Sequence, residues 1–594
     1  MPIYNAPIRD MKFILHDVLK MSQYSNLSTF EDLDPDVINA FLEESGKFSR
    51  DILTPLNRVG DINGCIRHDD GSVQTPRGFK KAYQLYCENG FGSLAKDVEF
   101  GGQGMPFLLQ MAISEMMVSA NIGFSAYPGL SSGAWSAIHA AASESQKKHY
   151  LPKMTSGQWT GTMNLTEPQC GTDLGLIKTK AVKHGDGSYR ISGQKIWISS
   201  GEHDLAENII HLVLARIEDA PNGIKGISLF VVPKFLINED SSLGERNAVS
   251  CGGLEDKMGL HGNSTCVMNY DGATGYLVGE ENKGLKGMFV MMNEARLSVG
   301  MQGYALSEAA YQNALGFAKE RRQGRALTGA KSPEHSADNI LVHPDVRRML
   351  MDVKCFIEGA RMLTYWAALK QDIIDQSGDE QDEQKANDHL SLLTPVIKSY
   401  FTDMGVKATI DAQQVLGGSG YCEEWGMSQF VRDVRITAIY EGTNGVQALD
   451  LIGRKLRMEG GRYWQSYFAE LDSVIAEHSQ NAELSFCVDG LASVKAKLME
   501  ATMWLIQNGM KDPNHAAAAS HDYLQIFALT ALAHMWVLSA KAALEKENSD
   551  DTFYQSKLVT ARYFFERVLP EADSHFAKLL TGADTLMALH EEQF

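Results

Sequence analysis

The sequence predicts an α+β fold: a helical N-terminal domain, a central antiparallel β-domain, a C-terminal helical bundle and an extra C-terminal helical domain. Apolar residues recur at helical spacing up to about residue 158, as at Ile38, Phe41 and Leu42, and again after Leu285. Between these regions, short apolar runs alternate with Gly, Asn and Asp, which indicates an antiparallel sheet or a small barrel. The length of 594 residues requires several domains.

The change of pattern along the chain predicts the domain boundaries. We expect an N-terminal helical domain over 1–158, a β-domain over 159–280, a four-helix-type domain over 281–458 and an additional helical domain over 459–594. In the third domain the expected helices are 289–319, 345–371, 389–416 and 445–458. The polar segments 331–339 and 377–388 are predicted surface loops.

Composition narrows the class of protein. The chain is 44% apolar and 22% charged, which is typical of a globular protein. Its net charge of −19 disfavours nucleic-acid binding, since phosphate contacts need Lys and Arg. Eight scattered cysteines, with no zinc-like spacing, favour a reducing compartment and no metal site. We find no secretory signal and no uninterrupted membrane-spanning stretch, and therefore expect a cytoplasmic protein.

Two motifs of the β-rich region could contact a ligand. In MNLTEPQCGT (163–172), Thr166 and Thr172 could donate hydrogen bonds to a ligand, and Gly171 allows its backbone to approach closely. The alternative interpretation of this motif is an ordinary turn. In GQKIWISSG (193–201), Trp197 is either a core residue or a flat wall against a flat cofactor, with Ser199 as a nearby donor.

Two motifs lie at predicted helix ends. RRQGRA (321–326) could complement a helix dipole, remain solvated, or bind pyrophosphate through the arginine forks. QQVLGGSGY (413–421) is a helix C-cap whose glycines would also let a nucleotide lie on exposed backbone. The sequence has no P-loop, no Rossmann glycine fingerprint and no HExxH. A flavin or nucleotide would therefore be held without the common dinucleotide motifs.

The motif IYEGTNGVQALDL (439–451) places one carboxylate just before a new helix. Glu441 could be a first-turn acid that complements the helix dipole. It could instead be a general base whose apolar surroundings raise its pKa. The residues of this motif alone leave both interpretations open.

Taken together and in this order, the five motifs resemble the acyl-CoA dehydrogenase family over roughly residues 40–455. The opening, the LTEPQCGTDLG wording and the C-terminal extension resemble a longer subfamily, which includes methylmercaptopropionyl-CoA and broad-range bacterial fatty acyl-CoA dehydrogenases. The resemblance implies the acyl-CoA dehydrogenase fold and an extended FAD, held partly by a neighbouring subunit of a homodimer or tetramer. It also implies an acyl-CoA substrate and electron transfer to an electron-transfer flavoprotein.

The resemblance assigns site residues by position. Those expected to bind FAD are Met163, Leu165, Thr166, Gly171, Thr172, Trp197, Ile198, Ser199, Arg321, Gln323, Gln414, Gly417, Gly418, Thr443 and Asn444. Those expected to contact substrate are Thr172, Asn293, Arg296, Tyr440 and Gly442. The family commonly has Asp at the place of Asn293, whereas Arg296 keeps the expected charge.

The family offers two places for the catalytic base. One corresponds to Glu441, and the other, immediately before Arg296, is occupied by Ala295, which cannot accept a proton. Glu294 is one residue away, about 100° around a helix. The resemblance therefore implies that Glu441 takes the α-proton while hydride leaves the β-carbon for flavin, giving the trans-2-enoyl-CoA. It also implies that the backbone N–H of Glu441 and a ribityl hydroxyl of FAD donate hydrogen bonds to the enolate oxygen.

Two other functions fit the same fold. An acyl-CoA oxidase would pass electrons to oxygen. A non-enzymatic alkylation-response flavoprotein would bind DNA and should have a basic C-terminal region, whereas residues 461–594 contain ten Lys and Arg against eighteen Asp and Glu. The residue pattern does not reveal acyl chain length, so straight fatty acyl and methylthio-acyl thioesters are both candidates.

Overall fold

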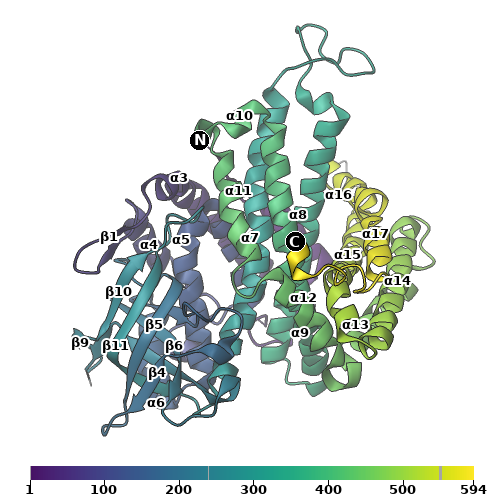
Figure 1. Ribbon diagram of the computed structural model, residues 1–594. Helices are drawn as coiled ribbons and strands as arrows, with labels where there is room; N and C mark the ends of the chain where they lie inside the picture. The colour runs from purple at the N-terminus through teal and green to yellow at the C-terminus, as the bar shows by residue number, and fades with distance from the viewer. Residues whose placement is uncertain (1, 32, 239, 547–550) are drawn as a thin grey trace. The chain divides into compact units, whose positions relative to one another are not determined.

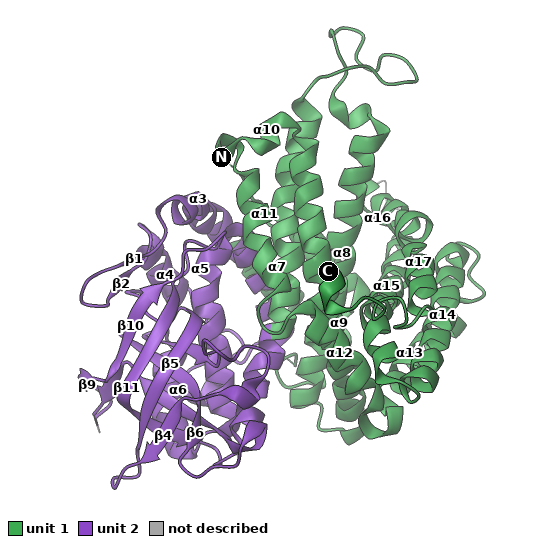
Figure 2. Cartoon of the chain, viewed as in Figure 1, with its two compact units in different colours: residues 1–44, 296–594 green, residues 45–295 purple. Residues whose placement is uncertain are grey.

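The computed structural model describes residues 2–31, 33–238, 240–546 and 551–594 and divides the chain into two compact units (Figures 1 and 2). Unit 1 comprises residues 1–44 and 296–594, and unit 2 comprises residues 45–295. The N-terminal residues thus group with the C-terminal helices. The four predicted domain boundaries remain predictions, because the two units divide the chain on a coarser scale.

Four helices of unit 2 precede its seven-stranded sheet along the chain. They are α3 (Thr54–Asn63), α4 (Phe79–Glu88), α5 (Phe107–Ala141) and α6 (Glu144–Thr155). Helix α5 bends at Asn121, whose backbone is not helical, and the Asn121 side chain accepts a 2.9 Å hydrogen bond from the N–H of Phe124. That contact resembles an N-cap, so α5 is two helical segments joined at an internal start.

The strands of unit 2 form a seven-stranded sheet that closes into a ring. Five strands make the ring in the order β11, β5, β4, β6, β7 and back to β11, while β10 pairs with β11 and β3 with β6. The predicted antiparallel β-domain is confirmed with one departure, since β6 pairs in parallel with β3 and β4. The bounds are β3 (Trp159–Asn164), β4 (Lys180–Lys183), β5 (Tyr189–Ser199), β6 (Asn208–Ile217), β7 (Ile227–Pro233), β10 (Val249–Leu254) and β11 (Thr265–Val278).

Strands β6 and β7 are buried on both faces, which explains their uninterrupted apolar sequences. On β6, Ile210, Leu212 and Leu214 belong to the core shared with α5 and α6. The intervening residues Val213 and Ala215 belong to the second core, formed by the barrel strands. Successive side chains of a strand point to opposite faces, so a strand between two cores needs apolar residues at every position. Two short hairpins accompany the sheet: β1–β2 (Ile66–Arg67, Val73–Gln74) precedes its strands in sequence, and β8–β9 (Phe235–Ile237, Leu243–Arg246) lies between β7 and β10.

Long helices build unit 1 (Figure 2). They are α7 (Gly284–Glu320, in unit 1 from Arg296 onward), α8 (Pro344–Gln376), α9 (Glu380–Val415), α11 (Met427–Arg435) and α12 (Asn444–Gly453), with the short α10 (Gly418–Tyr421) and the N-terminal α1 (Ile8–Lys12) and α2 (Pro35–Phe48). The prediction of a loop over 377–388 is wrong beyond Asp379, because Asp379 caps α9 and three acidic residues suit its first turn.

The C-terminal extension packs on the bundle within unit 1. It consists of α13 (Arg462–His478), α14 (Ser485–Gly509), α15 (Pro513–Leu544), α16 (Thr552–Tyr563) and α17 (Glu571–Leu579). Helix α15 is its centre and contacts α8, α9 and α12 as well as the other extension helices. A buried ion cluster also joins the N-terminus to both parts, since Asp10 bonds to Arg361 of α8 and to Lys557 of α16. These contacts make the extension part of the same core as the bundle.

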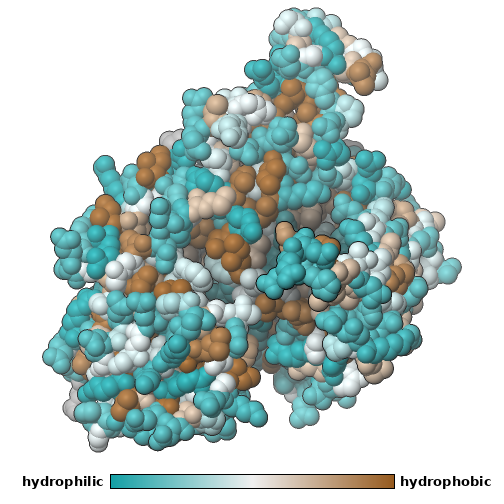
Figure 3. Space-filling model, in the orientation of Figure 1, coloured by the Kyte–Doolittle hydropathy of each residue, from teal (hydrophilic) through white to brown (hydrophobic). Residues whose placement is uncertain are grey.

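In the part of the chain that the structure describes, two helices are long and apolar enough to cross a membrane, Phe107–Ala141 and Pro513–Leu544. Their most apolar windows are 83% and 89% buried within the protein, as core helices of a folded protein are. On the face shown in Figure 3, hydrophilic residues predominate and hydrophobic groups are scattered among them.

Candidate active site

In unit 2, the segment after β3 lies beside the end of β5. The Thr162 hydroxyl donates to the carbonyl of Ser199 at 2.7 Å, and the N–H of Ile196 donates to the carbonyl of Thr166 at 3.0 Å. The structure thus brings together two segments predicted to face a flavin, 163–166 and 197–199.

Trp197 presents its ring outward from the end of β5. Its side chain is 60% exposed, while the neighbouring Ile198 is buried. The alternative that Trp197 is a core residue is therefore wrong. Its backbone has φ +59°, a region that costs a non-glycine residue of order 1–3 kcal/mol and persists only where the surroundings enforce it. An exposed flat ring in an enforced conformation is free to lie against a planar group.

The turn after Thr166 leaves backbone open to a ligand. Glu167 and Cys170 exchange two backbone hydrogen bonds of 2.9 Å, which closes a tight turn. Gly171 and Thr172 follow it and are exposed, and a Cβ atom added at Gly171 would meet nothing within 4 Å. This open surface is available for the donors predicted at Gly171 and Thr172.

A buried ion pair that the sequence analysis missed supports these segments. The Lys195 ammonium, 0% exposed, donates to the carbonyl of Leu165 and to Glu167, each at 2.9 Å. Glu167 also accepts from the hydroxyl and N–H of Thr179. Burial alone would raise the pKa of Glu167, but Lys195 and these donors hold it at about 2. The pair ties the turn after β3 to β5, and its only sequence signal was one charge in each of two otherwise uncharged motifs.

The first turns of α7 carry the predicted substrate residue of unit 2. Asn293 is exposed, and Ala295 has no group that could accept a proton. Glu294 instead accepts a 3.2 Å hydrogen bond from the Ser132 hydroxyl of α5. Glu294 therefore has a structural partner within unit 2.

In unit 1, Glu441 lies in a strained link between two helical segments. Its φ is +57° and that of Gly442 is +87°, so two successive residues are left-handed, and α12 starts only at Asn444. The interpretation of Glu441 as a first-turn acid is therefore wrong. Arg296 Nε donates to the Glu441 carbonyl at 3.3 Å, and the Gln447 amide donates to the Gly442 carbonyl at 3.2 Å. The Tyr440 hydroxyl bonds to Gln302 of α7.

The surroundings of Glu441 shift its pKa in opposite directions. Burial raises the pKa of Glu441, while the positive charges of Arg296 and Lys398 lower it, and the net shift is upward. Within unit 1 the described residues offer the Glu441 carboxylate no direct hydrogen bond or ion pair. A raised pKa without a fixed partner suits a group that must take up a proton.

Asn444, a predicted cofactor residue, turns its side chain inward. Its Oδ1 accepts from the Lys398 ammonium at 2.8 Å, and its Nδ2 donates to Asp403 at 2.7 Å. Lys398 and Asp403, both on α9, carry no recognisable motif, and the sequence analysis missed them. Contact between Asn444 and a cofactor would therefore use its backbone.

The predicted nucleotide-side residues of unit 1 are exposed. Arg321, Gln323, Gln414 and Thr443 lie on the surface, as do Gly417 and Gly418, where an added Cβ would meet nothing within 4 Å. Arg321 and Gln323 begin the segment between α7 and α8, which extends beyond the ends of both helices (Figure 1). Buried Asp338 organises that segment by accepting from Arg325 and from three backbone N–H groups.

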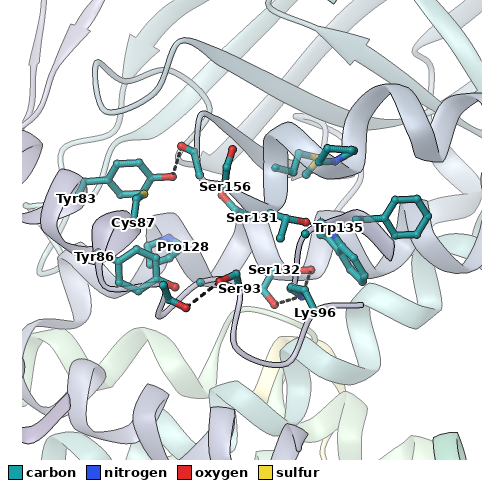
Figure 4. Close-up of a pocket in the computed structure, with 18 of the residues that line it drawn as sticks. Tyr83, Tyr86, Cys87, Ser93, Lys96, Pro128, Ser131, Ser132, Trp135 and Ser156 are labelled. Atoms are coloured by element: carbon teal, nitrogen blue, oxygen red, sulfur yellow. Dashed lines mark hydrogen bonds between the residues drawn. The ribbon is translucent and has the colours of Figure 1, made fainter. Parts of the chain in front are cut away.

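A cavity of about 320 Å³ opens elsewhere in unit 2 (Figure 4). Tyr83, Tyr86 and Trp135 line it, and the Lys96 ammonium donates to the Ser132 hydroxyl at its edge. None of the residues predicted to bind FAD or substrate lines this cavity. It is therefore separate from the sites that the motifs mark.

Four family models match consecutive parts of the chain. They are the N-terminal domain (residues 66–158), middle domain (162–273) and C-terminal domain (282–456) of acyl-CoA dehydrogenase, and the acetyl-CoA dehydrogenase C-terminal-like domain (467–590). Together they cover most of the 594 residues.

Full-length relatives are similar throughout. The chain is 40% identical to 3-methylmercaptopropionyl-CoA dehydrogenase of Ruegeria pomeroyi over 98% of this chain and 99% of the relative. It is 32% identical to the broad-specificity linear acyl-CoA dehydrogenase FadE5 of Mycobacterium tuberculosis over all of both chains.

Solved structures share the fold at lower identity. Caenorhabditis elegans ACDH-11 in complex with C11-CoA superposes with a TM-score of 0.78 at 17% identity, over 96% of this chain and 92% of that one. The Bacillus anthracis acyl-CoA dehydrogenase complexed with FAD gives 0.76 at 20% identity, over 94% and 90%. The predicted fold class is thereby confirmed.

Proposed function

This chain belongs to the acyl-CoA dehydrogenase family of oxidoreductases, and we propose that it converts an acyl-CoA thioester to the trans-2-enoyl-CoA with Glu441 as the base. The observation that carries the proposal is the state of Glu441. Its carboxylate has a raised pKa and no direct partner among the described residues of unit 1, and its strained backbone is anchored through Arg296.

The residues of unit 2 fit FAD as the cofactor. Trp197 offers an exposed ring at the end of β5, and Gly171 and Thr172 offer open backbone after the turn that follows β3. The Bacillus anthracis protein of the same fold binds FAD, which supports the assignment. FAD, when bound, supplies the acceptor for the hydride that leaves the β-carbon.

Each step follows from a residue of this chain. Glu441 takes the proton from the α-carbon, and the electron pair left behind forms the new double bond as hydride leaves the β-carbon. Negative charge then develops on the thioester oxygen, for which we propose the backbone N–H of Glu441 as a donor. Arg296 holds the Glu441 carbonyl and so orients that same peptide segment. We further propose an electron-transfer flavoprotein as the acceptor of the two electrons.

Two relatives indicate which classes of thioester substrate to test. The Ruegeria pomeroyi relative makes 3-methylmercaptopropionyl-CoA the first substrate to test, and the Mycobacterium tuberculosis relative makes straight-chain acyl-CoAs the second. The FAD-loaded enzyme should lose its yellow colour when either class is added without oxygen. A graded series of chain lengths, together with the methylthio compound, would identify the preferred thioester by its bleaching rate.

The same experiment separates the alternatives. Rapid peroxide formation in air would favour an oxidase, whereas reoxidation only by an electron-transfer flavoprotein supports the dehydrogenase. Absence of bleaching with every thioester, in a preparation that retains FAD, would contradict the proposed reaction. We also propose a homodimer or homotetramer, which light scattering of the purified enzyme would test.

A further inference from the structure

We propose that Lys398 is a positioning residue for the proton transfer: its buried ammonium anchors the 441–444 loop through Asn444 and places a fixed positive charge beside the Glu441 carboxylate. This inference rests on the proposed function, which makes Glu441 the base. Lys398 is on α9 and is 0% exposed.

Two successive turns of α9 hold both ends of the Asn444 amide. The Lys398 ammonium donates to Asn444 Oδ1 at 2.8 Å. Asn444 Nδ2 lies within hydrogen-bond distance of Asp403 Oδ1 (2.7 Å), Thr402 Oγ1 (2.9 Å) and the Ser399 carbonyl (3.1 Å). Because the acceptor and the donor of the amide are both engaged, Asn444 has one orientation.

The loop from Glu441 to Asn444 needs such anchors. Glu441 is strained, because a left-handed φ costs a non-glycine residue free energy that the surrounding contacts must balance, whereas Gly442 adopts its positive φ freely. Arg296 holds the Glu441 carbonyl at the start of the loop, and Lys398 holds Asn444 at its end. Two cations on different helices therefore fix the two ends of the segment that carries the base.

The same ammonium acts on Glu441 through space. The Lys398 charge favours the ionised carboxylate, yet Lys398 donates its hydrogen bond to a neutral amide and so leaves the carboxylate free to accept a proton. Burial lowers the pKa of Lys398 to about 8, so the amine is mostly charged at neutral pH. The charged or titratable groups of unit 1 around this pair include Arg296, Asp403, Tyr440, Asp450, Arg454 and Lys455. Asp403 is in turn under the influence of His521 of α15 and Arg435 of α11, and Tyr440 under that of Asp433.

The test compares pH profiles of the FAD-loaded enzyme. Butyryl-CoA is added anaerobically and the rate of flavin bleaching is followed in the parent enzyme and in Lys398→Met. Without the ammonium the carboxyl holds its proton more tightly, so the acid limb should move up by about one pH unit, and the rate on that limb should fall about tenfold. Lys398→Arg keeps the charge and should restore the midpoint.

Three further measurements separate charge from structure. Lys370→Met is the matched control, because burial also lowers the pKa of Lys370 to about 8 but its charged neighbours are Glu470, Lys385 and Asp382. It should leave the midpoint unchanged. Asn444→Ala keeps the ammonium and removes the anchor, so it should lower the plateau rate without moving the midpoint. Infrared titration of the Glu441 carboxyl band, identified by its loss in Glu441→Gln, reports the same pKa without substrate.

The outcomes are distinct. An unchanged midpoint in both kinetics and infrared titration of Lys398→Met, or an equal shift in Lys370→Met, overturns the proposal. If Lys398→Met does not retain FAD, the smaller change Lys398→Gln makes the same comparison. Failure of the parent enzyme to bleach with butyryl-CoA and with every other thioester of the series, or full activity of Glu441→Gln, instead contradicts the proposed function, while infrared titration still tests the effect of Lys398 on Glu441.

Discussion

Each unit contains a buried lysine near a functionally placed glutamate, and the two pairs differ in geometry. Lys195 in unit 2 and Lys398 in unit 1 are both 0% exposed, and burial lowers the pKa of each to about 8. Lys195 donates directly to Glu167, whose pKa is held at about 2. Lys398 donates to the Asn444 amide, and the pKa of Glu441 is raised.

The comparison shows how a carboxylate keeps its basicity in a protein interior. Glu167 accepts a direct ion pair and several hydrogen bonds, which stabilise its charge and leave it little affinity for a proton. Glu441 has positive charge nearby but no direct partner within unit 1, so burial dominates. The first arrangement suits a structural support and the second suits a general base.

The largest expected effect is loss of the base. Glu441→Gln removes the proton acceptor while keeping the size of the side chain, and a general base contributes about 10²- to 10⁴-fold to a rate. We expect flavin bleaching by acyl-CoA to slow by about 10³-fold, measured anaerobically by stopped flow. FAD content should match that of the parent enzyme, and a rate within tenfold of the parent would exclude Glu441 as the base.

The next largest effect is expected from breaking the buried ion pair between Lys195 and Glu167. Glu167→Gln leaves the Lys195 ammonium buried without its counter-charge, and breaking a buried pair in this way costs about 3–5 kcal/mol. We expect a large fall in denaturant midpoint together with weaker FAD retention. The double variant Lys195→Met with Glu167→Gln removes the unpaired charge and should recover part of the loss. Equal stability of Glu167→Gln and the parent enzyme would show that the pair is not a support.

The two glutamates should affect stability in opposite directions with pH. The folded pKa of Glu167 is depressed, so its stabilising contribution is complete above about pH 4.5 and is lost as the pH falls towards 2. The folded pKa of Glu441 is raised, so its contribution is present at low pH and is lost as the pH rises through that pKa. At pH 7, Glu441→Gln should therefore melt at or above the parent temperature, measured by calorimetry. A marked fall in the melting temperature of Glu441→Gln would contradict the raised pKa of the Glu441 carboxyl in the folded protein.

The smallest expected effect is that of removing the Trp197 side chain, two residues after Lys195 in the sequence. Trp197→Ala removes the exposed ring at the end of β5, and an aromatic stacking contact contributes about 0.5–1.5 kcal/mol beyond its buried area. We expect FAD to dissociate about tenfold more readily, as followed by the recovery of flavin fluorescence. Trp197→Phe should keep most of the affinity, and identical FAD affinity in the alanine variant would exclude the ring as a wall.

Local patterns predicted much of this protein because they follow from short-range physics. Helical and strand periodicity identified the order of helices, barrel and helices, and the resemblance carried by five motifs, with Ala295 at the rival position, identified Glu441 as the base candidate. The same reasoning missed the start of α9, because eight of the nine residues before His389 are polar and favoured a loop, although Asp379 caps a helix there. It also missed the parallel pairing of β6, which depends on strands distant in sequence.

The sequence by itself determined the class of fold, the family and the identity of the candidate base, since these depend on residue types and their spacing. Only the tertiary structure decided that Trp197 faces outward, that Lys195 pairs with Glu167, and that Lys398 holds Asn444 beside Glu441. The reason is physical: burial, charge and hydrogen bonding act between residues that folding brings together. Lys398 and Glu441 are 43 positions apart in the chain, and no local pattern links them.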